Sequence, residues 1–157
     1  MSVNSKSLLV VFHSASGNTQ AMADAVISGI EAAGTERLRH VVKHALEASE
    51  SDVKNADGVV LLTPENFGYM SGALKYFFDR IYYPCLDNTQ GMPYALLVRA
   101  GNDGQGAISS IERIITGLAW QEISPPIVSK GDFDAEILQQ CSELGSAFAL
   151  GLESGIF

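Results

Sequence analysis

Apolar positions along the chain follow two patterns, one typical of buried strands and one typical of amphipathic helices. Compact apolar runs predict three buried strands, and two more polar runs predict strands at sheet edges. The buried strands are residues 7–12, 58–63 and 94–100, and the edge strands are residues 37–44 and 125–131. Because the buried runs are apolar at almost every position, both faces of the sheet must be covered, which favours a parallel sheet flanked by helices.

The segments between these strands repeat apolar side chains at a spacing of three or four residues, which predicts helices. The predicted helices are residues 19–33, 71–83, 106–120 and 134–152, with a further short helix between the second and third strands. Strand and helix therefore alternate from end to end, without an internal repeat, a low-complexity tract or a linker. We expect residues 1–157 to form a single α/β domain with a doubly wound sheet.

The net charge of the chain limits the kinds of molecule that it is expected to bind. The chain has a net charge of −8, and nucleic-acid binding is not expected because contacts with phosphate backbones need clustered Lys and Arg. The acidic balance is explained by solubility alone, and it would also suit docking on a basic redox partner protein. No apolar run approaches the length of a membrane span, so no membrane association is expected.

Cysteine and histidine usage bears on compartment and on metal binding. Cys85 and Cys141 are the only cysteines, which predicts a reducing, cytoplasmic setting rather than a disulfide scaffold. His13, His40 and His44 have no metal-ligand spacing with a carboxylate or a cysteine, so we expect no metal site.

Three loops follow the three buried strands, and doubly wound sheets bind ligands beyond the carboxyl ends of their strands. The first loop, HSASGNTQ at residues 13–20, carries more hydroxyls and amides than a helix cap needs, which predicts a phosphate at a helix N-terminus. The second, residues 63–72, either holds a flat heterocycle or is a long loop packed over the core. The third, residues 99–106, is rich in glycine, which permits close backbone approach to a ligand or simple flexibility.

Two stretches carry a resemblance to a known family. SASGNT (residues 14–19) resembles the phosphate loop of the flavodoxin-like FMN-binding proteins. PENFGYMSGALKYFFDR (residues 64–80) is similar to the flavin loop and following helix of the NAD(P)H-dependent FMN reductase and quinone reductase branch. The resemblance implies a flavodoxin-like, three-layer fold, in which a doubly wound five-stranded parallel sheet of order 2-1-3-4-5 has helices on both faces.

The resemblance also implies FMN as the cofactor and names the residues that would hold it. The phosphate would contact Ser14, Ser16, Gly17, Asn18 and Thr19, with Gln20 near the start of the helix. The isoalloxazine ring would be lined by Pro64, Glu65, Asn66, Phe67 and Gly68, and flanked on its other side by Gly101, Asn102, Asp103, Gly104 and Gly106. No side chain is expected to be catalytic, because the flavin itself does the redox chemistry.

Two activities are the main alternatives on this basis, and a flavin-binding regulator or sensor without turnover is a third. The first is an oxidoreductase that passes hydride from NADPH or NADH to FMN and then to a quinone-type acceptor, in a ping-pong sequence. The alternative is a flavodoxin-type one-electron transfer protein. The third loop lacks the aromatic residue that typical flavodoxins stack on the flavin, which favours the enzyme, whereas the charge of −8 favours the carrier.

Basic and aromatic side chains bear on which molecules the chain is expected to bind. Arg99 and Lys75 are candidate contacts for a nicotinamide nucleotide. The expected partner is a small-molecule acceptor or a redox partner protein. The aromatic row within residues 76–83 exceeds what one buried face needs, which leaves open a wide core contact or the interface of a homodimer or tetramer.

Overall fold

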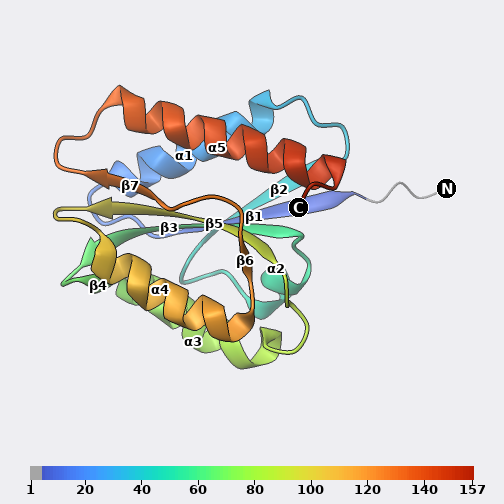
Figure 1. The fold of residues 1–157 in the computed structure, drawn as a ribbon, viewed down its shortest axis with the longest axis horizontal. Helices are drawn as coiled ribbons and strands as arrows, with labels where there is room; N and C mark the ends of the chain where they lie inside the picture. The colour runs from blue at the N-terminus through green and yellow to red at the C-terminus, as the bar shows by residue number, and fades with distance from the viewer. Residues whose placement is uncertain (1–4) are drawn as a thin grey trace.

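A twisted sheet lies between two layers of helices in the computed structural model, which describes residues 5–157 (Figure 1). The strands are β1 (Lys6–Phe12), β2 (Leu38–His44), β3 (Gly58–Asn66), β4 (Tyr69–Met70), β5 (Pro93–Ala100), β6 (Gln121–Glu122) and β7 (Ile127–Lys130). The helices are α1 (Asn18–Ala32), α2 (Glu50–Lys54), α3 (Gly72–Cys85), α4 (Gln105–Leu118) and α5 (Ala135–Ser154). Helices α1 and α5 cover one face of the sheet, and α3 and α4 cover the other.

The long strands are parallel and follow the order β2-β1-β3-β5, with β6 and β7 both pairing with β5. Counted over the five predicted strands this order is 2-1-3-4-5, so the predicted topology is confirmed. The more polar runs at residues 38–44 and 127–130 lie at the sheet edges, as expected. From β1 the chain first crosses to β2 on one side and later continues to β3 on the other, so the direction of winding reverses between β1 and β3.

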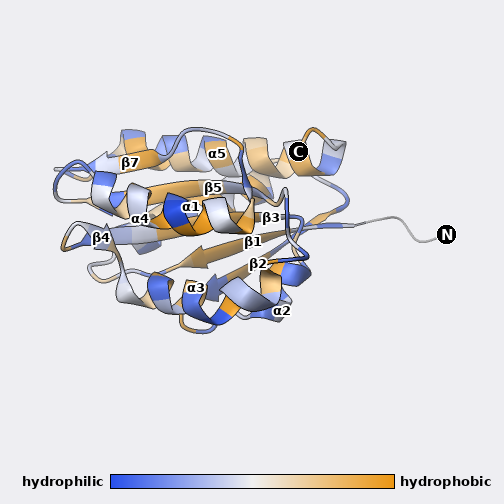
Figure 2. Ribbon diagram, turned by 60° about the horizontal axis from the view of Figure 1, so that its bottom comes forward, coloured by the Kyte–Doolittle hydropathy of each residue, from blue (hydrophilic) through white to orange (hydrophobic). Residues whose placement is uncertain are grey.

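Each face of the sheet has its own apolar core, because consecutive strand residues point to opposite sides. Leu9 and Val11 pack with α3 and α4, whereas Leu8 and Val10 pack with α1 and α5. Figure 2 shows the apolar strands lying between helices that carry both hydrophobic and hydrophilic residues. Cys85 and Cys141 are buried free thiols that belong to opposite cores.

Several predicted boundaries differ from the structure by two or three residues, and two of these differences have a clear local reason. Strand β3 does not end before Pro64 but continues to Asn66, because its last residues pair with β4 in an antiparallel hairpin. Helix α4 ends at Leu118, because Ala119 takes a left-handed backbone conformation with φ 59°. Trp120 therefore follows the helix, where it is buried, and its indole donates a hydrogen bond of 2.9 Å to the Thr89 hydroxyl.

The short strands β4 and β6 are absent from the sequence prediction, because two residues are too few to show a periodic pattern. Within residues 5–157 no helix combines the length and the apolar character that crossing a membrane requires.

Candidate functional site

The three predicted loops follow the carboxyl ends of β1, β3 and β5. Because these strands are adjacent and parallel, the loops lie at the same end of the sheet. The backbone N–H of His13 donates a hydrogen bond of 3.2 Å to the Leu62 carbonyl, which holds the first loop against the end of β3. The winding reverses between β1 and β3, and ligands of this architecture bind beyond the carboxyl ends of the strands at such a point.

The first loop wraps around the start of α1. The backbone N–H of Gly17 donates to the Ser14 hydroxyl oxygen at 3.0 Å, and Gly17 takes a left-handed φ of 96° just before the helix. The side chain of Ser16 is exposed, whereas that of Thr19 is 2% exposed and packs inward. Gln20 directs its amide along the helix toward Asp24. The exposed donors of this loop are therefore neutral hydroxyls and backbone N–H groups.

Helix α1 begins without a side-chain cap, as α4 does. The side chains of Ser49, Ser71 and Asp134 cap α2, α3 and α5, whereas Gly17 offers α1 no side-chain acceptor. The first turn of α1 also contains no acidic residue. Its leading N–H groups and the positive end of its dipole are therefore open to an anion, which fits the phosphate predicted there.

The second loop is the β3–β4 hairpin, with Phe67 and Gly68 at its tip. Asn66 pairs with Tyr69, and the two residues between them have φ values of 53° and 69°, as a type I′ turn requires. A positive φ suits Gly68 but strains the bulky Phe67. The Phe67 side chain nevertheless extends fully into solvent, with a relative exposure of 106%. A strained and exposed aromatic residue marks this tip as a candidate contact surface.

Buried hydrogen bonds hold the base of this hairpin. The Thr63 hydroxyl, which is fully buried, donates to the Pro64 carbonyl at 2.8 Å and accepts from the Ser71 N–H at 3.0 Å. The end of β3 is thereby tied to the start of α3. Pro64 itself is buried, so of the predicted ring-lining residues it is the least accessible.

The hairpin is also braced against the start of α4. A Glu65 carboxylate oxygen accepts from the Ala107 N–H at 3.2 Å, and the Ser110 hydroxyl accepts from the Met70 N–H at 3.2 Å. A Cβ atom on Gly106 would lie 1.9 Å from the backbone oxygen of Gly68, so only glycine allows this approach. The structure thus brings the second and third predicted loops into direct contact.

The third loop presents Gly101, Asn102 and Asp103 to solvent. Gly104 precedes α4 with φ 75° and, like Gly17, supplies no side-chain cap. The Asp103 carboxylate accepts from the Gln105 N–H at 3.1 Å. Helices α1 and α4 therefore both begin directly after a glycine at this end of the sheet, and the hairpin contacts the start of α4.

The nearby basic side chains are already engaged within the chain. The Arg99 guanidinium donates to the Ser129 hydroxyl at 3.1 Å and to the Gly131 carbonyl at 2.6 Å. Lys75 pairs with Asp79 at 2.6 Å. Neither contact supports the predicted role of these two residues in binding a nicotinamide nucleotide.

His13 adjoins the first loop, and its surroundings disfavour the protonated form of its ring. Its ring meets that of His44 edge-on, with 5.4 Å between the centroids, and its buried Nδ1 has no hydrogen-bond partner within residues 5–157. Burial, and to a lesser extent the charge of His44, lower the pKa of His13 below its usual value. In the part of the chain that the structure describes, no group of three or more His, Cys, Asp or Glu side chains could hold a metal ion.

Thr63, Ser71 and Ser110 are positioning residues that the sequence patterns do not reveal. Their contacts join different elements, and each residue type is ordinary where it stands in the sequence. Glu65 was predicted to line the ring, yet the structure uses one of its oxygens to brace α4.

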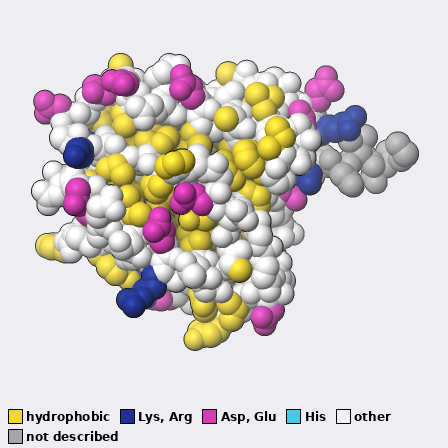
Figure 3. Space-filling view, in the orientation of Figure 1, with side chains coloured by type: hydrophobic (Ala, Val, Ile, Leu, Met, Phe, Trp, Pro, Cys, Tyr) yellow, Lys and Arg dark blue, Asp and Glu magenta, His cyan; other side chains and the backbone are white. Residues whose placement is uncertain are grey.

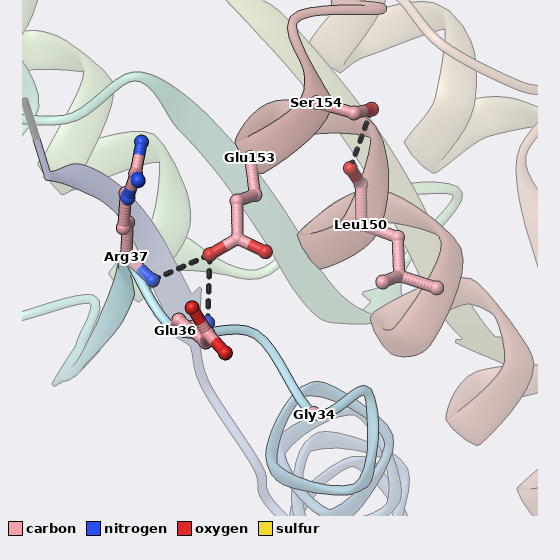
Figure 4. A pocket seen from close by; sticks show the side chains of 6 residues that line it. All are labelled: Gly34, Glu36, Arg37, Leu150, Glu153 and Ser154. Carbon is pink, nitrogen blue, oxygen red and sulfur yellow. Dashed lines mark hydrogen bonds between the residues drawn. The ribbon is translucent and has the colours of Figure 1, made fainter.

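A separate hollow of about 530 Å³ lies away from these loops, between the segment before β2 and the end of α5 (Figure 4). One Glu153 oxygen there accepts hydrogen bonds from the backbone N–H groups of Glu36 and Arg37. Because that oxygen already ties the end of α5 to the strand, this hollow is explained by the packing of the chain.

A comparison with known families decides the affiliation of the chain. The sequence profile of the family described as NADPH-dependent FMN reductase matches residues 32–132. The chain belongs to this family. The matched residues include the hairpin and the start of α4 but not the HSASGNTQ loop, so the assignment of that loop rests on its own geometry. The affiliation inferred from the two sequence motifs is confirmed.

The proteins that are similar to this chain include a flavodoxin and an NAD(P)H dehydrogenase. A flavodoxin of Aquifex aeolicus is 31% identical over 71% of this chain and 59% of its own length. An NAD(P)H dehydrogenase (quinone) of Acidithiobacillus ferrooxidans is 34% identical over 46% of each chain. This chain therefore spans only about half the length of these relatives. A solved flavodoxin structure from the domain Archaea superposes with a TM-score of 0.78 at 25% identity, covering 94% of this chain and 99% of that one, which confirms the flavodoxin-like fold.

Proposed function

We propose that the chain binds FMN and acts as an oxidoreductase that takes hydride from NADPH or NADH and reduces a quinone-type acceptor. The observation that carries this proposal is the uncapped start of α1 beside the braced hairpin. Membership of the NADPH-dependent FMN reductase family supports it. A cytoplasmic location is part of the same proposal, and the two buried free thiols agree with it.

The first loop has the chemistry that a phosphate needs. Ser14 and Ser16 would donate from their hydroxyls, and the backbone N–H groups of Asn18 and Thr19 would donate from the helix end. No acidic side chain stands in the first turn to repel the anion. These neutral donors and the helix dipole would replace the lysine that other phosphate sites use.

The hairpin and the third loop would hold the ring system. FMN, when bound, supplies the redox chemistry, accepting hydride and passing electrons to an acceptor. Backbone N–H groups of Asn66, Phe67 and Gly68 would line one edge of the ring, and those of residues 101–103 the other. Fixed backbone donors stabilise negative charge that develops during a reaction, because they need no reorganisation at that moment.

The exposed residues of the third loop favour an enzyme over an electron carrier. Gly101, Asn102 and Asp103 are exposed and include no aromatic side chain that could cover one face of the ring. A reduced nicotinamide and then an acceptor could stack in turn on that open face, as a ping-pong sequence requires. Arg99 and Lys75 make contacts within the chain, and these contacts give no support for a preference between NADPH and NADH.

A flavodoxin-type electron carrier is the second candidate. It is supported by the 31% identity to the Aquifex aeolicus flavodoxin and by the net charge of −8, which would suit docking on a basic protein. In that case the electrons would leave singly to a redox partner protein.

Anaerobic mixing separates the two candidates. The purified chain is loaded with FMN, mixed with NADPH or NADH, and followed by flavin absorbance, with free FMN as the control. We expect bleaching that is much faster than that of free FMN. A bound flavin that both nucleotides leave oxidised, but that dithionite reduces in two separate one-electron steps, would establish the carrier instead. Absence of flavin binding would overturn both.

A further inference from the structure

His13 and His44 stand at the ends of neighbouring strands, beside the first loop of the candidate site. His13 directly follows β1 and is the first residue of the loop, and His44 is the last residue of β2, paired in register with Phe12. The two histidine rings meet edge-on with 5.4 Å between their centroids, and the His44 ring also meets that of Phe12 edge-on at 5.7 Å. The histidine pair is therefore a contact between the first loop and the end of β2.

Hydrogen bonds of the backbone hold the same place. The Phe12 carbonyl accepts from the Ala45 N–H at 2.8 Å, and the Leu62 carbonyl accepts from the His13 N–H at 3.2 Å. The Arg80 guanidinium of α3 donates to the Ala45 carbonyl at 2.7 Å. The base of the first loop is thus held between β3 on one side and, on the other, a segment after β2 that is bonded to α3.

Each ring has one nitrogen that a proton would disturb. The His44 Nδ1 accepts a hydrogen bond of 3.0 Å from the Leu46 N–H, so it carries no proton while that bond exists. The buried His13 Nδ1 has no hydrogen-bond partner within residues 5–157, and a proton there would be a buried donor without an acceptor. Burial, and to a lesser extent the charge of His44, lower the pKa of His13 accordingly. Protonation of either ring would therefore break a hydrogen bond or leave a donor unsatisfied.

The surroundings offer no carboxylate to balance a positive charge on the pair. Among residues 5–157, the histidine that forms an ion pair is His40, 3.7 Å from Glu31, and neither ring of the pair does so. Arg80 adds a fixed cation one residue from the pair, and Glu47, the carboxylate nearest to it along the chain, is exposed. The rest of the first loop carries no charge, and the first turn of α1 has no acidic residue. Figure 3 shows acidic and basic side chains on one face of the molecule but no histidine side chain, so the pair lies away from that face.

We propose that His13 and His44 are positioning residues for the first loop, which binds its anion most tightly while both rings are neutral. When the pair gains a proton, the bond from Leu46 is lost or the two rings repel, and the loop separates from the segment after β2. The hydroxyls of the loop and the start of α1 then no longer face the same anion. This inference rests on the proposed function, because the anion is the phosphate of FMN.

Charge alone would predict the opposite pH dependence. A protonated histidine beside a phosphate normally strengthens binding, because the charges are opposite. Here the repulsion between the rings and the unsatisfied donor on His13 oppose that effect. The affinity for FMN should therefore fall, rather than rise, as the pH drops below 6.5, the ordinary pKa of histidine.

Flavin titrations of the full chain between pH 7.5 and 5.5 test the pair, with His13→Phe as the variant that keeps a ring but takes up no proton. The FMN phosphate ionises alike in both experiments, so its effect cancels in the ratio of the two dissociation constants. We expect the ratio of the wild-type constant to the variant constant to rise by about threefold between pH 7.5 and 5.5. His13→Ala, which removes the ring, should weaken FMN binding by about tenfold at pH 7.5, and His13→Phe should restore most of that loss.

His40→Gln is the matched control, because it removes a histidine of the same strand that pairs with Glu31 instead. It should keep the wild-type pH profile, and circular dichroism should show that every variant stays folded over this pH range. In the flavin-free chain, NMR should show the Leu46 amide signal shifting as the rings of His13 and His44 titrate.

Two failures are distinguishable. Absence of FMN binding at pH 7.5 would overturn the proposed function and this inference with it. Binding of FMN with a ratio that stays constant or falls toward pH 5.5 would overturn this inference alone. A Leu46 amide signal that does not respond to the titration would also overturn it, because the first loop and the segment after β2 would then not be coupled through the pair.

Discussion

The ring of Phe67 stands in solvent at the tip of the β3–β4 hairpin, on a backbone with φ 53°. Left-handed backbone costs an ordinary residue about 1–2 kcal/mol, and burial of the ring within the chain does not offset this cost. The strain is therefore best explained by a contact outside the folded chain. A bound flavin ring would provide that contact.

Replacing Phe67 separates stability from binding. Phe67→Asn should raise the free energy of unfolding by about 1 kcal/mol, because Asn-Gly is the preferred pair in a type I′ turn. The same change should weaken FMN binding only modestly, because the phosphate anchor persists. Urea unfolding and a flavin titration measure the two effects. Tyr69→Asn, on the same hairpin but without positive φ, is the control that should not stabilise, and a destabilised Phe67→Asn would contradict this reading.

His13 should make stability depend on pH. Its pKa is lowered in the folded chain by burial and by His44, so the unfolded chain binds a proton more readily. Stability from this source is complete above the unfolded value of 6.5, falls as the pH drops through it, and levels off below the folded pKa. His13→Phe should flatten the change in unfolding free energy between pH 7.5 and 5. Equal slopes in the two proteins would remove His13 as the cause.

At the scale of elements, the close approach of α4 to the hairpin is the contact most sensitive to substitution. Gly106→Ala would place a methyl group 1.9 Å from the Gly68 oxygen, and the backbone must shift to accept it. We expect a loss of about 1–3 kcal/mol in unfolding free energy, as for overpacking, together with weaker FMN binding. Amide hydrogen exchange at Met70 and Ala107 should also accelerate.

Gly72→Ala is the matched control for that substitution. Gly72 also lies in the first turn of a helix, but a Cβ atom there would meet nothing within 4 Å. It should leave both stability and flavin affinity nearly unchanged. Equal effects of the two substitutions would mean that the contact between Gly106 and Gly68 does not position the hairpin.

At the scale of the whole molecule, the architecture follows from the sequence because it depends on repeated patterns. The apolar runs at residues 58–63 and 94–100 and the helical spacing between them specify the layers and the parallel sheet. Edge strands are recognisable by their polar residues and by Pro125 and Pro126. Boundaries are less predictable, since one left-handed residue, Ala119, ends α4 two residues early.

The candidate site could be predicted only in part. The polar loop at residues 13–20 and the glycines near residue 104 are visible as local composition. The bond between Glu65 and Ala107 joins residues 42 positions apart, and that between Met70 and Ser110 spans 40 positions. Such contacts depend on how α4 packs against the hairpin, which no local pattern encodes.

We propose that the first loop and the start of α1 hold the phosphate of FMN. Ser16 is the best residue for a test because its side chain is exposed. Thr19 is buried, and Ser14 already accepts the Gly17 N–H, so an acidic residue at either position would also change the fold of the loop. Ser16→Asp instead adds a negative charge beside the proposed phosphate with little effect on packing.

The most direct measurement compares the dissociation constants of FMN and of riboflavin, which lacks the phosphate, by quenching of flavin fluorescence. We expect the wild-type chain to bind FMN about 100-fold more tightly than riboflavin, since charge-assisted hydrogen bonds contribute about 1.5–3 kcal/mol each. Ser16→Asp should remove most of this preference and leave riboflavin binding unchanged. Equal affinity of the wild-type chain for the two flavins, or no binding of FMN, would show that the first loop does not hold the phosphate.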